Sequence, residues 1–279
     1  MGSQNLRRRR TSLAAGLATF ALAVGLAAVP AQAVDKTKYI ALGDSYAAGQ
    51  GAGPYQDACY RSENSYSELA AEVKAVKLIT NAACSGMTTQ QVVATQLRQL
   101  NKSTELVTIT AGGNNLGVGD IVTNCGSGDP ALAEACTRAS GTARDLLESG
   151  RLAQDVTAMI QSVQAAAPNA KIVVTGYPYL FDPLNLDPAD PLTPFIYQAA
   201  GLAIGLDDAI AAAVQTADPK AVRVQYVDVR TTFSGHGINS TEPWINGVIP
   251  GSPDSFHPNA KGYLAYYKAL KLAGAYPAP

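Results

Sequence analysis

The chain has 279 residues, of which 47% are hydrophobic and 15% are charged, and its formal net charge is −1. This length allows one sizeable hydrophobic core, and the composition is that of an ordinary globular protein with few charges. No basic tract follows the first residues, so the charge pattern argues against nucleic acids or anionic surfaces as partners.

Residues 1–33 have the features of a secretory signal peptide. Four arginines at positions 7–10 precede an apolar stretch, and Pro30-Ala31-Gln32-Ala33 offers a cleavage site after Ala33. We expect secretion by the general route rather than the twin-arginine route, whose full motif is absent. Removal takes away four of the 21 basic residues and none of the 22 acidic ones, which leaves 17 against 22, a balance of −5. No later segment looks apolar enough to span a membrane.

Short apolar strands alternate with helical stretches, which favours an α/β fold with a parallel sheet. We expect strands over residues 39–42, 77–80, 106–110, 171–175 and 223–227. Helices are expected near residues 65–73, 89–100, 130–148, 152–167, 195–216 and 260–273. The simplest organisation is one domain over residues 34–279, with a monomer as the default state.

Two long loops, over residues 177–194 and 231–256, are rich in residues that interrupt regular structure. Proline prevents either loop from continuing a helix or a central strand. Each follows an expected strand, so both should lie at the carboxyl edge of the sheet, where open α/β sheets bind ligands. Long loops in compact domains are often functional.

Four cysteines remain after signal removal, and an even number in an exported chain predicts two disulfides. Of the three possible pairings we favour Cys59–Cys84 with Cys125–Cys136, because each closes a local loop. A zinc site is disfavoured, since there is no CxxC pair and the chain has only two histidines. We expect no metal and no cofactor.

A serine stands at the carboxyl end of the first expected strand, in Gly43-Asp44-Ser45. Taken alone, such a tripeptide is usually a turn or a helix cap. At the start of a helix, however, Ser45 would meet the positive end of the helix dipole, which favours developing negative charge. The Gly-x-Ser-x-Gly elbow of α/β-hydrolases is not matched, because position 47 is alanine.

A serine nucleophile needs a base, and the candidates are His236 and His257. His257 lies just before the last expected helix, and Asp254 three residues upstream could orient its ring. Capping of that helix is the alternative role for the pair. His236 lies between two glycines, far in sequence from an acidic partner, and ranks behind His257.

Acyl transfer also needs hydrogen-bond donors for the developing oxyanion. The third expected strand ends in Gly112-Gly113-Asn114, where the asparagine can offer a side-chain N–H. Gly86 follows the second strand in the same way and offers a backbone N–H. Each motif alone is typical of a turn. Together, however, the serine, glycine, asparagine and histidine would all lie at one edge of the sheet.

These four blocks, in this order, resemble the SGNH or GDSL hydrolase family, and the likeness covers the whole mature chain. The resemblance implies a three-layer α/β/α, flavodoxin-like fold with a five-stranded parallel sheet in the order 2-1-3-4-5. It implies that Ser45 is the nucleophile and His257 the base, and that the Ser45 N–H, the Gly86 N–H and the Asn114 side chain form the oxyanion hole. The chain further resembles the secreted bacterial lipase and phospholipase branch, which implies a Cys59–Cys84 disulfide.

Two features depart from the family pattern. The third block usually ends in Gly-Asn-Asp, whereas position 115 here is asparagine. Some members of the branch orient the histidine with a main-chain carbonyl, which Ser255 or a nearby residue would supply. We favour Asp254 in this role, because a carboxylate stabilises imidazolium better than a neutral carbonyl does.

The sequence therefore predicts a secreted serine ester hydrolase, most simply one that acts on acyl lipids. An acetyl-polysaccharide esterase is the second hypothesis, and a non-catalytic binding module or a metallophosphoesterase is remote. Aromatic side chains of the two long loops could line an apolar acyl cleft or only anchor the loops. The substrate-binding candidates are Tyr177, Tyr179, Phe181 and Trp244.

Overall fold

Five parallel strands form a sheet in the order expected from the sequence. The structure, a computed structural model, describes residues 35–126, 129–184 and 186–278. Hydrogen bonding orders the strands β2-β1-β3-β4-β5, with every neighbouring pair parallel. Their bounds are β1 (Thr37–Gly43), β2 (Val76–Asn81), β3 (Leu106–Thr110), β4 (Lys171–Thr175) and β5 (Val224–Val227).

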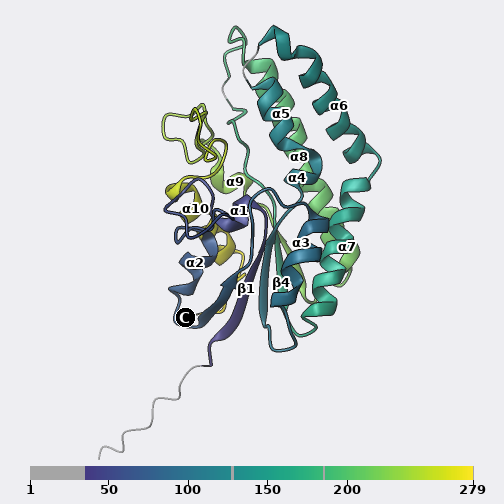
Figure 1. Ribbon diagram of the computed structural model, residues 1–279, viewed down its shortest axis with the longest axis vertical. Helices are drawn as coiled ribbons and strands as arrows, with labels where there is room; N and C mark the ends of the chain where they lie inside the picture. Colours follow the sequence, from purple (N-terminus) through teal and green to yellow (C-terminus); the bar gives the residue numbers. More distant parts are fainter. Residues whose placement is uncertain (1–34, 127–128, 185, 279) are drawn as a thin grey trace, which may run out of the picture. The chain divides into compact units, whose positions relative to one another are not determined.

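Helices cover both faces of this sheet, so the fold has the three layers that the family resemblance implied. On one face α2 (Tyr66–Ala71) packs against α10 (Ala260–Leu272), as Figure 1 shows. The other face carries α3 (Thr89–Gln96), α7 (Arg151–Ala166) and α8 (Thr193–Ala217). The central strand β3 is buried at every residue, which explains why it consists of Leu, Val, Ile and Thr and carries no charged residue.

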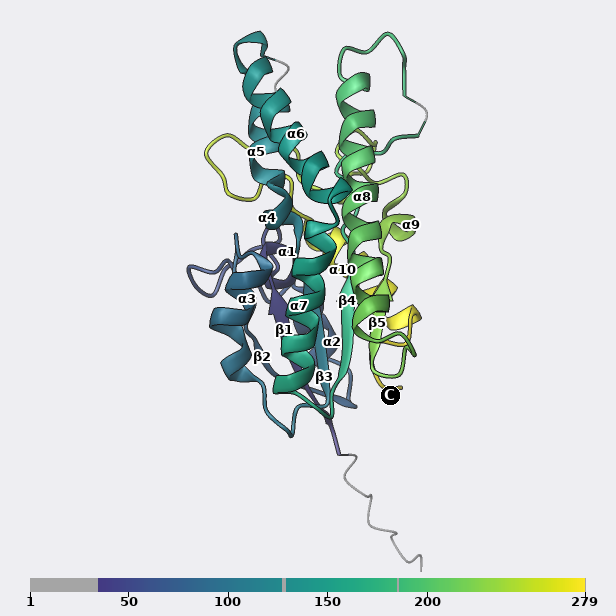
Figure 2. The ribbon, with the colours of Figure 1, turned by 90° about the vertical axis from the view of Figure 1, so that its right-hand side faces the viewer.

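Three helices extend past the carboxyl ends of the strands. These are α5 (Val118–Cys125), α6 (Ala133–Glu148) and the N-terminal part of α8 (Figure 2). Helix α5 was not expected from the sequence, because its eight residues lie between Gly117 and Gly126 and give too short an apolar pattern. The helix expected over residues 130–148 begins with a 3₁₀ turn, Pro130–Leu132, before α6.

Shorter helical turns complete the described chain: α1 (Ser45–Ala48), α4 (Gly113–Leu116), α9 (Arg230–Phe233) and a 3₁₀ turn at Leu97–Gln99. Both expected disulfides are present, Cys59–Cys84 and Cys125–Cys136. The second disulfide joins α5 to α6. The predicted signal peptide lies outside the described residues.

Helix α8 differs from one expectation. Among the described residues it is the one helix whose length and apolar composition would suffice to cross a membrane, whereas the sequence analysis expected no such segment. Its alanine-rich sequence has few charges, and it packs against α7, β4 and β5. Membrane crossing is not implied by this composition alone, since core helices meet the same criterion.

Candidate active site

Ser45 is the first residue of α1, directly beyond the carboxyl end of β1. Gly43 has φ +132°, and a Cβ on it would lie 2.1 Å from the Thr110 carbonyl oxygen, so only glycine fits there. Asp44 then caps α1, and its side chain accepts a hydrogen bond from the Tyr46 N–H at 3.0 Å. The serine therefore stands at a helix start, as expected, and not at a strained elbow.

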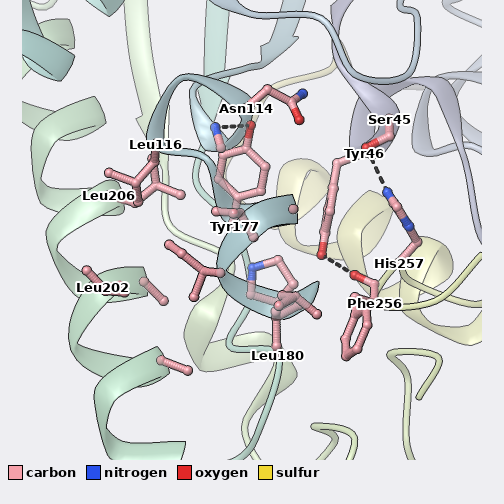
Figure 3. Close-up of a pocket in the computed structure, with 18 of the residues that line it drawn as sticks. Ser45, Tyr46, Asn114, Leu116, Tyr177, Leu180, Leu202, Leu206, Phe256 and His257 are labelled. Atoms are coloured by element: carbon pink, nitrogen blue, oxygen red, sulfur yellow. Dashed lines mark hydrogen bonds between the residues drawn. The ribbon is translucent and has the colours of Figure 1, made fainter. Parts of the chain in front are cut away.

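The Ser45 hydroxyl meets His257 from the other end of the chain. Ser45 Oγ lies 2.8 Å from His257 Nε2 (Figure 3). On the other side of the ring, His257 Nδ1 lies 2.9 Å from the Ser255 carbonyl oxygen. A carbonyl oxygen can only accept, so Nδ1 carries the proton and Nε2 is left to accept the serine proton. This is the tautomer that a general base for Ser45 needs.

The expectation that Asp254 accepts the hydrogen bond of His257 Nδ1 is wrong. The Asp254 carboxylate accepts instead from the Tyr55 hydroxyl, and the Ser255 carbonyl takes the position at Nδ1. The physical reason is that the Asp254 carboxylate is engaged by Tyr55, and the backbone, which has φ +63° at Phe256, presents the Ser255 carbonyl to the ring instead. The Asp254 carboxylate acts on the His257 ring through its charge, and the Asp254 carbonyl accepts from the His257 backbone N–H at 3.3 Å.

Burial controls the charge of His257. Desolvation lowers its pKa to about 4, while the hydrogen bond with Ser255 and the nearby charge of Asp254 act in the opposite direction. The imidazole is therefore neutral at neutral pH and can take a proton from Ser45. His236, the other histidine, stacks on Trp244 with ring centroids 3.4 Å apart and lies outside this site.

Of the two further oxyanion candidates, Asn114 is the one that lines the cavity beside Ser45. One N–H of its side chain donates to the Met87 carbonyl at 3.0 Å, and an amide group has a second N–H to offer. Gly86, which has φ +78°, precedes Met87 in the chain and does not line the cavity.

Asn115, the departure from the family pattern, has a local structural role. Its Oδ1 accepts from the Thr89 N–H at 2.9 Å, and its Nδ2 donates to Thr89 Oγ1 and Gln90 Oε1, both at 2.9 Å. These bonds tie the third block to the start of α3. An aspartate could accept from Thr89 but could not donate.

An apolar cavity of about 340 Å³ opens at the Ser45–His257 pair. Its walls are the carboxyl-edge turns and the facing sides of α5 and α8, and Figure 3 shows Leu116, Leu202 and Leu206 on the side away from His257. This volume is within the range of small-molecule sites. The α5 and α8 residues of the wall are Val118, Gly119, Ile121, Val122, Thr123, Phe195, Ala199, Leu202, Ala203 and Leu206.

Of the four expected substrate-binding residues, only Tyr177 lines this cavity. Tyr179 faces Arg230, with its ring centroid 6.0 Å from the guanidinium carbon, and Phe181 packs edge-on against Phe195 at 5.6 Å. Trp244 stacks on His236. These three side chains anchor loops, which was the alternative role for them.

The wall formed by α5 and α8 was not expected from the sequence. In α8 the spacing of Phe195, Ala199, Leu202 and Leu206 is that of one helix face, which could have been read as a wall, but a buried core stripe has the same spacing. In α5 the signal was too short to identify a helix.

Comparison with known proteins shows the family to which the chain belongs. Residues 41–265 match the GDSL-like Lipase/Acylhydrolase family. The chain is 36% identical to a lipase of Streptomyces rimosus, over 93% of this chain and 97% of the relative. It is 32% identical to Lipase 1 of Streptomyces coelicolor, over 91% and 92% of the two chains.

Solved structures give the same result. The crystal structure of an extracellular lipase from Streptomyces rimosus matches with a TM-score of 0.73 and 34% identity, over 85% of this chain and 99% of that one. Phospholipase A1 from Streptomyces albidoflavus NA297 matches with a TM-score of 0.76 and 32% identity, over the same shares. The chain described here is a member of the GDSL-like lipase/acylhydrolase family and a hydrolase of carboxylic esters.

Proposed function

We propose that the protein hydrolyses esters of medium- and long-chain fatty acids, with Ser45 as nucleophile and His257 as general base. The apolar cavity that opens at this pair carries the proposal, because an acetyl ester has no chain to fill it. Relatives named as lipases and a phospholipase A1 support a lipid substrate. An acetyl-polysaccharide esterase would need polar groups where α5 and α8 present aliphatic ones.

The reaction is a two-step acyl transfer. Ser45 Oγ attacks the ester carbonyl carbon while its proton moves to His257 Nε2, and the new imidazolium is held by the Ser255 carbonyl. The tetrahedral oxyanion is stabilised by the Ser45 N–H, the Asn114 amide and the Gly86 N–H. The ester C–O bond breaks as Nε2 returns the proton to the alcohol. Water then releases the acid by the same route.

The acyl chain lies along α8, from Leu206 toward Phe195. Leu206 marks the end near the oxyanion turn, because its Cδ1 lies 3.5 Å from the Cβ position of Gly112. The two residues are about 16 Å apart along the helix, since an α-helix rises about 1.5 Å per residue. Each methylene buried on this path contributes at most about 0.8 kcal/mol, or roughly fourfold in kcat/KM.

Export is the second part of the proposal. Two disulfides favour an oxidising compartment, and the Streptomyces rimosus relative is an extracellular lipase. We propose that residues 1–33 direct this export and are removed, which N-terminal sequencing of the exported protein tests directly.

A p-nitrophenyl ester series from acetate to palmitate tests the activity. We expect kcat/KM to rise with chain length and Ser45→Ala to abolish turnover while the melting temperature is retained. Hydrolysis of acetate alone, with no turnover of phospholipid or triglyceride, would favour a carbohydrate esterase. Turnover by Ser45→Ala would exclude Ser45 as nucleophile.

Ala199→Phe tests the cavity. A phenyl ring at this position fills the far part of the groove, so kcat/KM on decanoate should fall tenfold or more, while kcat/KM on acetate stays within twofold. Ala212→Phe, on an exposed face of the same helix, is the matched control and should leave both values unchanged. An equal loss on both esters would refute the acyl path along α8.

A further inference from the structure

The Tyr177 hydroxyl lies between the two turns that carry Ser45 and Asn114. It donates a hydrogen bond to Asp44 Oδ2, in the residue before Ser45. It also accepts a hydrogen bond from the Gly113 N–H at 3.1 Å, in the residue before Asn114 (Figure 3). One oxygen atom thus joins the nucleophile turn after β1 to the turn after β3.

Burial makes these two hydrogen bonds hard to replace. Asp44 is 1% exposed and Tyr177 7% exposed, so water has little access to either group. A buried donor or acceptor left without a partner costs about 1–3 kcal/mol. Burial also raises the pKa of the Asp44 carboxyl to about 7, and the Tyr177 hydroxyl acts against that shift.

Tyr177 is itself held from several sides. Its backbone N–H donates to Asp207 Oδ1 of α8 at 2.9 Å, and Asp207 Oδ2 lies 3.2 Å from Arg230 Nε. Its ring packs edge-on against Tyr46 with centroids 5.1 Å apart. Phenol and backbone are both fixed, so the hydroxyl has little freedom to follow either turn if one moves.

We propose that Tyr177 is a positioning residue that sets the separation between Ser45 and the Asn114 amide. Efficient acyl transfer needs donors at the place where the oxyanion forms, and a small displacement of such a donor lowers the rate. Tyr177 fixes this separation by holding Asp44 on one side and Gly113 on the other. The inference rests on the proposed function, since it takes Ser45 and Asn114 as parts of the machinery.

A substrate-binding role for Tyr177 would give a different result. The ring also lines the cavity, so loss of a substrate contact would raise KM and would do so most for long acyl chains. Loss of positioning lowers kcat on every ester alike, because all esters form the same oxyanion. The two roles therefore separate in the kinetic constants.

Tyr177→Phe removes the hydroxyl and keeps the ring. We expect kcat to fall about 10- to 100-fold on both p-nitrophenyl acetate and decanoate with KM within twofold, because loss of a direct oxyanion donor costs about 10²–10³ and an indirect displacement costs less. An alkylboronic acid, which forms a tetrahedral adduct on a reactive serine, should bind more weakly by a similar factor. A change in KM alone would overturn the proposal.

Tyr39→Phe is the matched control. Its hydroxyl is also buried and bonds Thr108 Oγ1 at 2.7 Å, but that contact lies within the sheet and touches neither turn. We expect a lowered melting temperature with unchanged kcat. If the control lost as much kcat as Tyr177→Phe, general loss of stability would explain both and the positioning role would be refuted.

A double-variant cycle tests the contact itself, and Asp44→Asn alone still tests it if Tyr177→Phe folds poorly. Asp44→Asn should lower kcat, because Tyr46 and Tyr177 donate to different oxygens of Asp44 and an amide keeps only one of the two as an acceptor. Asp44→Asn combined with Tyr177→Phe should lose little more than the larger single effect. Fully multiplicative losses would refute a shared contact. Wild-type protein that turns over no ester would instead contradict the proposed function, whereas active wild type with unchanged variants contradicts only the role of Tyr177.

Discussion

The replacement Asp254→Asn separates two ways of holding the catalytic histidine. The substitution removes the charge of residue 254 and leaves the Ser255 carbonyl in place at His257 Nδ1, 2.9 Å away. In a serine triad, loss of the charge of the orienting aspartate costs about 10⁴ in kcat, because the wrong tautomer forms. Here the carbonyl still enforces the correct tautomer.

The magnitude follows from what Asp254 contributes. Its carboxylate accepts a hydrogen bond from the Tyr55 hydroxyl. Its charge raises the pKa of His257, but this effect is smaller than those of desolvation and of the Ser255 hydrogen bond. Loss of this charge weakens stabilisation of the imidazolium through space. We expect less than about tenfold loss in kcat, equivalent to less than about 1.4 kcal/mol.

The assay is kcat on p-nitrophenyl decanoate at pH 8, with the melting temperature measured alongside. Tyr55→Phe is the control, because it disturbs the same contact and leaves the charge of Asp254 in place. A loss of 10³ or more in Asp254→Asn, with the melting temperature retained and the control active, would refute the carbonyl as the sufficient partner of His257.

Further expectations concern pH and the disulfides. Because desolvation lowers the pKa of His257 to about 4, the base is protonated only as the pH falls through about 4. We therefore expect kcat/KM at pH 5.5 to equal its value at neutral pH. A pH profile of kcat/KM with its midpoint near 6.5, the ordinary pKa of histidine, would contradict the burial of the ring. Replacing Cys59 and Cys84, separated by 25 residues, by serine should lower the free energy of unfolding by about 3.5 kcal/mol, because the unfolded chain gains loop entropy. The same replacement of Cys125 and Cys136, separated by 11 residues, should lower it by about 2.8 kcal/mol, because the loop is shorter. Denaturant unfolding measures both. Loss of the Cys125–Cys136 disulfide, which joins α5 to α6, should also reduce activity on decanoate more than on acetate, because α5 forms part of the cavity wall. Equal losses on the two esters would show that α5 does not line the acyl path.

Periodicity and local chemistry were enough to place the main elements. The β-branched and apolar residues of β3 predict a strand buried on both faces, and a glycine-rich turn after it predicts a close approach to a ligand. Parallel strands end at one edge of the sheet, so Ser45, Asn114 and His257 could be expected to meet without any coordinates. The pairing Cys59–Cys84 followed in the same way from loop length and from the family resemblance.

The tertiary structure decided contacts that depend on the direction of single groups. Asp254 and Ser255 are neighbours in sequence, and only the folded backbone shows that the carbonyl of Ser255, and not the carboxylate of Asp254, reaches the histidine. Likewise, Tyr177 and Tyr179 are equivalent as loop aromatics, yet one lies at the site and the other faces Arg230. The sequence by itself determined which chemical groups gather at the carboxyl edge, because strands that alternate with helices run parallel and end at the same edge of the sheet. Which atoms then touch was decided by packing between segments far apart in the chain, and no local pattern encodes that.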